Sequence, residues 1–224
     1  MFDIRHALRV NKLFKNLSDQ ELNQFLITSG YHISDFQTGQ IIALEGERLT
    51  QIGLVLEGTI EVQKNYPSGK MVVVNRLKAG GVFGEVVIFS DKKVYPSTIY
   101  SATRSKIMLI DKENVLKICL QNGKFLNNLL QLLSEKILVL NHRLHILSGE
   151  TIRQKICLYL LEQYQKQKTL SIPIHISRET MAEQFGITRP SLSRELGNMK
   201  RDGMIDFDKK HIIIKDLASL KQLF

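Results

Sequence analysis

An apolar residue recurs at alternating steps of four and three between residues 126 and 147, and this spacing constrains the fold more than any other feature. The series is Leu126, Leu130, Leu133, Ile137, Leu140, Leu144 and Leu147. Such a pattern is the heptad seam of a coiled coil, held here for three repeats. We therefore predict a long helix, from about residue 111 to 148, whose seam packs against a second copy of the chain. A helix buried wholly within its own monomer is the alternative.

A second apolar series on the same predicted helix is expected to pack against the preceding domain. It comprises Phe125, Leu129, Leu132, Val139 and Ile146. Gly149 follows the periodic stretch, where a glycine often caps a helix and forms a hinge. We accordingly predict two domains: residues 1–148, which include the dimerisation helix, and residues 149–224.

Short apolar runs rich in Val and Ile, separated by glycines, fill the region from residue 31 to residue 110. Their connections are too short for intervening helices, which favours an antiparallel sandwich or barrel. Strands are expected at residues 41–44, 52–56, 59–63, 71–77 and 105–110. The first thirty residues have helical spacing instead, and Ser18 can cap a helix there. The fold class is therefore α+β.

The composition suits a basic, globular protein. The chain has 224 residues, a formal charge of +9 and 43% hydrophobic residues. It contains no run of about 20 apolar residues and no signal-peptide layout, so we expect a cytoplasmic protein and no membrane partner. The positive charge favours an acidic partner such as nucleic acid.

Neither the cysteines nor the histidines are arranged to bind a metal. Cys119 and Cys157 lie among aliphatic residues, as small buried residues do. His142 and His145 form the only close histidine pair. An iron–sulfur cluster or zinc site needs several closely spaced ligands, so we expect neither.

A helix-turn-helix pattern follows the hinge, after a predicted helix at residues 151–167 and a short strand at residues 171–176. Ser177 can cap a first helix over residues 178–185, and Gly186 then breaks it. Thr188 can cap a second helix over residues 189–200, with Pro190 tolerated in its first turn. In DNA-binding proteins of this arrangement the second helix enters the major groove.

Two arginines project from the expected outer face of that second helix. Arg189 and Arg194 each offer two parallel donors that match guanine O6 and N7. Surface salt bridges, for instance of Arg194 with Glu195, are the alternative. Residues 203–215 read as two short strands around a basic turn, a wing that would contact phosphates. The predicted DNA contacts are Ser177, Arg178, Thr188, Arg189, Ser191, Arg194, Lys200, Lys209 and Lys210.

These features together resemble the Crp/Fnr family of transcription regulators. In the first domain the resemblance is carried by Phe36, Gly39, Glu45, Gly46, Glu47, Gly58 and the stretch from Gly80 to Glu85, and in the second by residues 177–196. It implies an N-terminal double-stranded β-roll like that of cyclic-nucleotide-binding domains, a long dimerisation helix and a C-terminal winged helix-turn-helix. Pro190 stands where many relatives have a glutamate that accepts from cytosine.

The resemblance also implies an effector site in the roll. Its candidate residues are Phe83, Gly84, Glu85, Tyr95, Ser97, Thr98, Leu140, Asn141 and Leu144. Pro96 replaces the arginine that neutralises the phosphate in cyclic-nucleotide binders. Leu140 and Asn141 stand where a cyclic-AMP regulator has two hydroxyl residues. We therefore expect an unknown effector other than cyclic AMP, in a more apolar site. For Glu85, a structural role in the turn is the alternative.

The sequence thus predicts a homodimeric, effector-controlled transcription regulator, not an enzyme, that binds palindromic double-stranded DNA. RNA polymerase is a candidate further partner. Two other classes stay open at this point. A metal-dependent cupin-like enzyme needs a His and Glu cluster, yet no histidine lies between His32 and His142. A nucleotide-binding interaction module would not need the winged motif.

Overall fold

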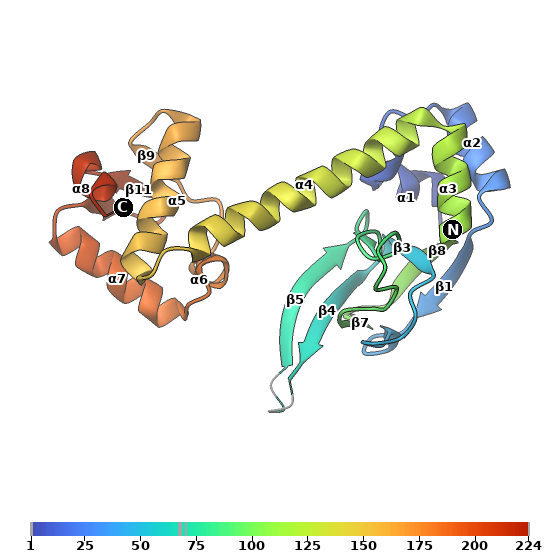
Figure 1. Cartoon of the computed structure of the whole chain (residues 1–224), viewed down its shortest axis with the longest axis horizontal. Coiled ribbons are helices and arrows are strands. Elements are labelled where there is room, and N and C mark those ends of the chain that lie inside the picture. Colours follow the sequence, from blue (N-terminus) through green and yellow to red (C-terminus); the bar gives the residue numbers. More distant parts are fainter. Residues whose placement is uncertain (1, 67–68, 70, 224) are drawn as a thin grey trace. The chain divides into compact units, whose positions relative to one another are not determined.

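The computed structural model describes residues 2–66, 69 and 71–223. The chain forms two compact units, Met1–Glu135 and Lys136–Phe224, and helix α4 (Gly123–Leu147) contributes to both (Figure 1). The N-terminal unit contains two four-stranded sheets whose strand orders are β1-β8-β3-β6 and β2-β7-β4-β5. All of their pairings are antiparallel. The strands are β1 (His32–Phe36), β2 (Ile41–Ala43), β3 (Gln51–Glu57), β4 (Thr59–Asn65), β5 (Met71–Lys78), β6 (Val82–Phe83), β7 (Thr98–Ser101) and β8 (Ser105–Asp111).

Strand β3 explains how the roll holds two layers of core. Ile52 and Leu54 join the core formed with the helices, whereas Val55 joins the core between the sheets. A strand buried on both faces reads as a continuous apolar run, as this one does. The buried residues between the sheets are Ala43, Val55, Ile60, Phe83, Ile99 and Ile107. They come from both sheets, so the predicted antiparallel sandwich is confirmed.

Helices from the start of the chain, and one that follows β8, pack on the other side of the sheet that contains β3. They are α1 (Ile4–Val10), the short 3-10 helix η1 (Lys12–Phe14), α2 (Asp19–Thr28) and α3 (Lys112–Gln121). The Phe14 ring packs edge-on to Phe25 at 4.7 Å and to Phe125 at 5.6 Å between centroids. Ser18 forms a capping box: its Oγ accepts from the Glu21 N–H at 3.2 Å, and the Glu21 carboxylate accepts from the Ser18 N–H at 2.6 Å. The predicted cap is confirmed.

The expectation of one helix from about residue 111 to 148 is wrong at Asn122. This residue is extended (φ −136°, ψ 102°) and separates α3 from α4. Its side-chain Oδ1 accepts from the Phe125 N–H at 2.9 Å, an N-capping contact for the new helix. Both apolar series begin only after the break, at Phe125 and Leu126, and residues 111–121 before it contain no proline, so the predicted helix was extended too far towards the N-terminus.

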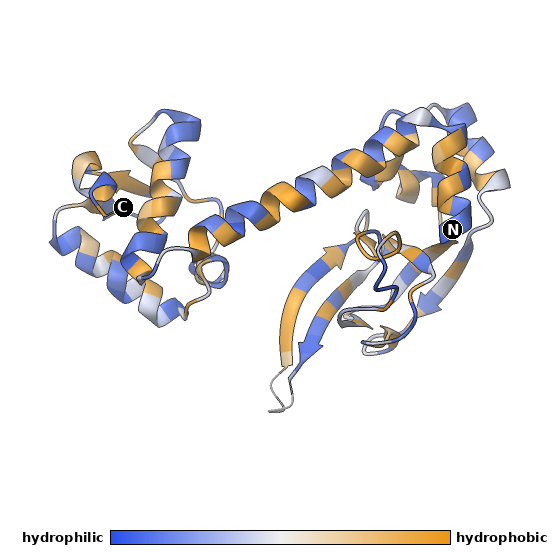
Figure 2. Ribbon diagram, in the orientation of Figure 1, coloured by the Kyte–Doolittle hydropathy of each residue, from blue (hydrophilic) through white to orange (hydrophobic). Residues whose placement is uncertain are grey.

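The two apolar series on α4 have different surroundings (Figure 2). Phe125, Leu129 and Leu132 are buried in the N-terminal unit, and Ile146 is buried in the C-terminal unit. Val139 is exposed, against the expectation that the whole series would pack on the preceding domain. Exposure is high along the seam at Leu126, Leu130, Ile137, Leu140, Leu144 and Leu147, while Leu133 is half-buried.

The C-terminal unit has its own core and a small three-stranded sheet of order β10-β11-β9. Its elements after α4 are α5 (Ile152–Gln167), β9 (Ser171–Pro173), α6 (Arg178–Phe185), α7 (Arg189–Arg201), β10 (Ile205–Phe207), β11 (His211–Ile214) and α8 (Leu217–Lys221). Gly149 is buried and lacks the positive φ expected of a glycine cap. A Cβ there would lie 2.9 Å from the Lys155 backbone N, so this position needs glycine for close approach.

Candidate nucleic-acid interface and effector site

Both helices of the predicted helix-turn-helix begin at the caps expected from the sequence. The Ser177 Oγ accepts from the Thr180 N–H at 3.1 Å, and the Thr188 Oγ1 accepts from the Ser191 N–H at 3.3 Å. Gly186 ends α6 in the left-handed region, with φ 65°. The hydroxyl groups of the capping residues therefore fix the start of each helix on the solvent side.

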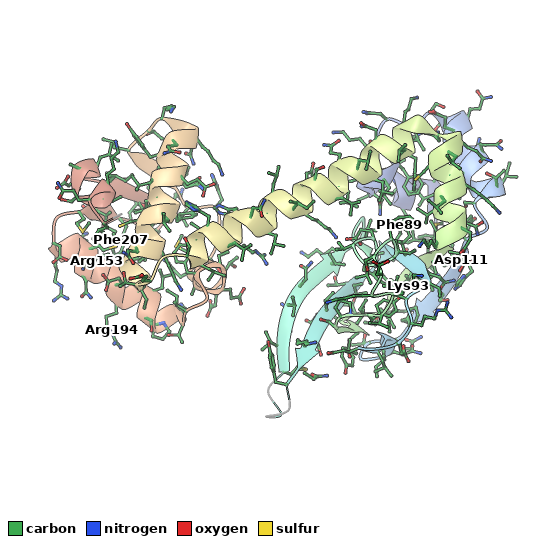
Figure 3. The ribbon with its side chains drawn as sticks, viewed as in Figure 1. Phe89, Lys93, Asp111, Arg153, Arg194 and Phe207 are labelled. Atoms are coloured by element: carbon green, nitrogen blue, oxygen red, sulfur yellow. The ribbon has the colours of Figure 1, made fainter. Side chains whose placement is uncertain are left out.

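Helix α7 divides into a buried and an exposed face. Leu192 and Leu196 pack into the core, as the spacing predicts. Arg194 is exposed and projects away from the domain (Figure 3), and within the described part of the chain it forms no ion pair. Arg189 is also exposed, with its Nη1 a loose 4.0 Å from the Glu179 Oε1. Two guanidinium groups are thus available on the outer face.

The salt bridge considered for Arg194 is made by another arginine. Arg153 of α5 donates through Nε to Glu195 at 2.6 Å and through Nη2 to Asp202 at 2.7 Å. Hydrogen bonding to Glu195 raises the pKa of Arg153. This pairing joins α5 to both α7 and its C-cap, and sequence reasoning missed it because no local pattern links residues so far apart.

The predicted wing is formed by β10 and β11, with Phe207 opposite Ile212 in the register. One Asp208 carboxylate oxygen accepts from the N–H groups of Lys210 and His211 at 2.6 and 2.7 Å, which closes the turn. These backbone hydrogen bonds lower the pKa of Asp208. Lys209 and Lys210 are exposed on the turn, as expected of phosphate contacts.

Two other predicted DNA contacts have surroundings that the sequence did not reveal. Arg178 is only partly exposed, and burial lowers its pKa. The Lys200 Nζ lies 2.5 Å from the Asp206 Oδ1, so its charge already has an acidic partner. The predicted contact Ser191 shares a short hydroxyl contact of 2.8 Å with Thr188. All nine candidates thus lie in the C-terminal unit, and they differ in their exposure and in the contacts that they already make.

The effector candidates in the roll are mostly buried. Phe83 lies in the core between the sheets, and Glu85, Ser97 and Thr98 are also buried. The Thr98 Oγ1 accepts from the Glu45 N–H at 3.1 Å. These side chains therefore belong to the packed roll as well as to its candidate site.

Tyr95 and Gly84 complete the candidates in this unit. Burial, and to a smaller degree the Glu47 charge, raise the pKa of Tyr95. Gly84 has φ 82°, and a Cβ there would lie 3.0 Å from the Gln51 carbonyl oxygen. Leu140, Asn141 and Leu144 lie on the part of α4 that belongs to the C-terminal unit and are exposed there.

Lys64 is a cation of this region that sequence reasoning missed. Its Nζ donates to the Pro96 carbonyl oxygen at 3.0 Å and pairs with the Glu45 carboxylate. The pairing of β4 with β7, in which Gln63 lies opposite Thr98, brings Lys64 next to Pro96. Only the strand register reveals this neighbour, because Lys64 lies in β4 whereas Pro96 lies in the loop just before β7.

Two protein families match the chain, one in each unit. Residues 33–122 match the cyclic nucleotide-binding domain, and residues 154–223 match the Crp-like helix-turn-helix domain. The chain belongs to the Crp/Fnr family of transcription regulators. It is accordingly a DNA-binding transcription regulator with a cyclic-nucleotide-binding-like sensor domain, rather than an enzyme. The predicted family and fold class are confirmed.

Relatives of this Crp/Fnr regulator cover most of its length. It is 24% identical over 200 residues to the global nitrogen regulator of Synechococcus elongatus, which covers 86% of this chain and 89% of that protein. It is 21% identical over 191 residues to the CRP-like cAMP-activated global transcriptional regulator of Mycobacterium tuberculosis, with coverages of 83% and 85%. The structure of the Thermus thermophilus catabolite activator protein shares the fold, with a TM-score of 0.58, 19% identity and coverages of 95% and 98%.

The described residues contain neither a metal-binding cluster nor a membrane-spanning helix. No group of three or more His, Cys, Asp or Glu side chains among them is arranged to hold a metal ion. No helix formed by these residues has both the length and the apolar character needed to cross a membrane.

Proposed function

We propose that this regulator works as a homodimer that binds palindromic double-stranded DNA through α7, under the control of a small molecule other than cyclic AMP. The outer face of α7 carries the proposal: Arg189 and Arg194 are exposed on a helix whose opposite face is fixed in the core. In this motif the second helix reads base edges, and each bidentate arginine contact discriminates by about 1–3 kcal/mol. The dimer would separate its two half-sites by about one DNA turn.

The remaining candidates would contact phosphates rather than bases. Ser177 and Arg178 start α6, and Lys209 and Lys210 lie on the wing turn. Lys200 would contribute from the end of α7. Such contacts add affinity without sequence information and make binding depend on salt. With its DNA target, the protein would act in the cytoplasm.

The residues of the roll do not fit cyclic AMP. Pro96 offers neither a charge nor an N–H at the place of the phosphate-binding arginine, and it is exposed. The neighbouring Lys64 is already paired with Glu45. A cyclic phosphate bound beside Pro96 would lack the charge-assisted partner that an arginine provides, and the loss of such a partner from a buried pair costs about 2–5 kcal/mol. We infer that the effector is less anionic and contacts Tyr95 and the apolar side chains of the roll.

Selection of bound duplexes from a random pool tests the proposal, with the purified chain alone and with added metabolite extract. We expect a palindromic consensus whose recovery changes with the extract. Arg189→Ala and Arg194→Ala should each relax one base position, whereas Lys221→Ala on α8 should leave the consensus unchanged. An enriched sequence without symmetry would contradict the dimer, and no enrichment would contradict sequence-specific binding.

A titration with cyclic AMP tests the effector separately. We expect no heat of binding in calorimetry and no change in the selected consensus. Micromolar binding of cyclic AMP would overturn this part of the proposal while leaving DNA recognition intact. RNA polymerase stays a prediction, to be tested by transcription with the purified enzyme on a promoter that carries the consensus.

A further inference from the structure

Phe207, at the end of β10 and labelled in Figure 3, has two cations of the DNA-binding domain beside its ring. The Arg178 guanidinium carbon and the Lys200 Nζ each lie over its ring, 5.3 Å from the centroid. Arg178 begins α6 and Lys200 lies in the last turn of α7. A single ring therefore connects both helices of the helix-turn-helix with the wing.

The two cations differ in how their charge is compensated. Lys200 has the Asp206 carboxylate at 2.5 Å. Arg178 has no carboxylate partner within 4.0 Å among the described residues, and its Nη1 has the Met181 sulfur at 3.9 Å. Burial lowers the pKa of Arg178, since the guanidinium is partly desolvated. What holds it is the negative face of an aromatic ring, which attracts a cation within about 6 Å.

The surroundings of Arg178 suit an anion. Arg178, Phe207, Asp208 and Lys209 line one open depression at the base of the wing. The Asp208 carboxylate, one oxygen of which accepts two backbone hydrogen bonds, is the acidic member of this lining, against the two cations Arg178 and Lys209. The depression thus combines a partly desolvated guanidinium, which suits bidentate contact with phosphate, with the exposed Lys209.

We propose that Phe207 is a positioning residue for phosphate binding. Its ring holds the Arg178 guanidinium at the base of the wing without neutralising it, and it keeps Lys200 on the same side. A DNA phosphate then meets a prearranged cation, so that less side-chain entropy is lost on binding. This inference rests on the proposed DNA interface and adds a neutral residue that acts through its two cationic neighbours.

Substitutions at position 207 distinguish the effect of the aromatic face from that of the apolar volume of the side chain. Phe207→Leu keeps an apolar side chain in the core but removes the aromatic face, whereas Phe207→Tyr keeps both. We expect Phe207→Leu to weaken binding about 5-fold, the size of one or two exposed cation–π contacts. The plot of log affinity against log salt should become less steep by roughly 1, which corresponds to the loss of one phosphate contact. Phe207→Tyr should restore both values.

The experiment measures fluorescence anisotropy of a labelled duplex of random sequence with the full chain, over a series of KCl concentrations. Phe89→Leu is the matched control, because Phe89 in the N-terminal unit also has a lysine over its ring, with the Lys112 Nζ at 5.5 Å. It should leave affinity and slope unchanged. Wild-type affinity and slope in Phe207→Leu would overturn the inference, as would a Phe207→Tyr variant weakened as much as Phe207→Leu.

A fluorinated phenylalanine at position 207 covers the case in which Phe207→Leu does not fold. Fluorine withdraws charge from the ring face at nearly constant shape, so affinity should fall stepwise with each added fluorine while the unfolding temperature stays constant. Affinity independent of fluorination would overturn the role of the ring. Absence of salt-dependent binding by the wild-type chain would instead contradict the DNA interface itself, so the two failures are distinguishable.

Discussion

The Glu21 carboxylate gives the N-terminal unit a defined acid response. A hydrogen bond from Lys124 at 2.9 Å, followed by one from the Ser18 N–H, lowers its pKa from 4.5 to about 2. Because the folded pKa lies below the unfolded one, this stabilisation is complete above the unfolded value. It is lost as the pH falls through about 2.

Titration of the Glu21 carboxyl by NMR measures this directly. We expect a midpoint near 2 in the wild-type chain and a higher midpoint in Lys124→Met, which removes the largest cause. Lys117→Met, on the neighbouring helix α3, serves as the control and should not move it. A wild-type midpoint at the ordinary value of 4.5 would contradict the observed geometry.

Gly53 is the glycine whose replacement should disturb the roll most. A Cβ at this position would lie 2.0 Å from the Cζ atom of the Phe83 ring. Overpacking of this kind costs about 1–3 kcal/mol, so Gly53→Ala should lower the free energy of unfolding in urea by at least that amount. Gly197→Ala is the control: nothing lies within 4 Å of its Cβ, and in a helix it should gain about 0.5–1 kcal/mol. Equal stability of the two variants would refute the steric account.

Single residues were predictable where the chemistry is local. Leu192 and Arg194 lie two positions apart on α7, and the helical period alone assigns one to the core and the other to solvent. Arg178 and Lys64 were not predictable in the same way. The burial of Arg178 depends on Phe207, and the contact of Lys64 with Pro96 depends on strand register. Their surroundings exist only once distant segments have packed.

At the scale of elements, Arg153 links α5 to α7 through two acidic residues. Arg153→Met should lower the free energy of unfolding of the C-terminal unit by about 1–2 kcal/mol. It removes two charge-assisted hydrogen bonds and leaves the half-buried Glu195 carboxylate without its arginine partner. Amide hydrogens of α7 should also exchange faster. Lys166→Met, which breaks the exposed pair with Glu162, should cost under about 0.5 kcal/mol. Similar losses in both variants would show that Arg153 has no special role.

Element boundaries followed from the sequence only where a cap marks them. Ser18, Ser177 and Thr188 each accept a backbone N–H at the helix start, and each was identifiable from its residue type and position. Asn122 caps a helix too, yet no proline marks a boundary near it, so residues 111–148 were expected to form one continuous helix. At Gly149 the sequence suggested a feature that is absent. A glycine after a helix suggests a left-handed cap, whereas here the glycine makes room for the Lys155 backbone.

At the scale of the whole molecule, the order of patterns along the chain was more informative than any one of them. Each unit buries its own core, and periods of two and of 3.6 residues mark where strands and helices contribute to it. The identity of the effector could not be predicted from such patterns. The surroundings of Lys64 and Tyr95 in the roll are set by packing between strands rather than by any repeating pattern.

The exposed seam of α4 leads to a prediction about assembly. Leu130 is 55% exposed and Leu144 is 57% exposed, although the spacing is that of a buried coiled-coil core. Burying a leucine side chain contributes about 1.5–3 kcal/mol, so a seam of this length supplies enough apolar surface for a stable dimer. Leu130→Glu should therefore yield a folded monomer in sedimentation equilibrium, since two carboxylates would face each other at the dimer axis.

Leu120→Glu provides the matched control. Leu120 is 88% exposed on α3, outside the seam, so the same substitution there should leave the dimer intact. DNA binding should divide the variants likewise: Leu130→Glu loses the preference for a palindrome over a single half-site, and Leu120→Glu keeps it. A Leu130→Glu chain that stays dimeric would mean that another surface holds the copies together, and the spacing of the two α7 helices would then have to be explained from that surface.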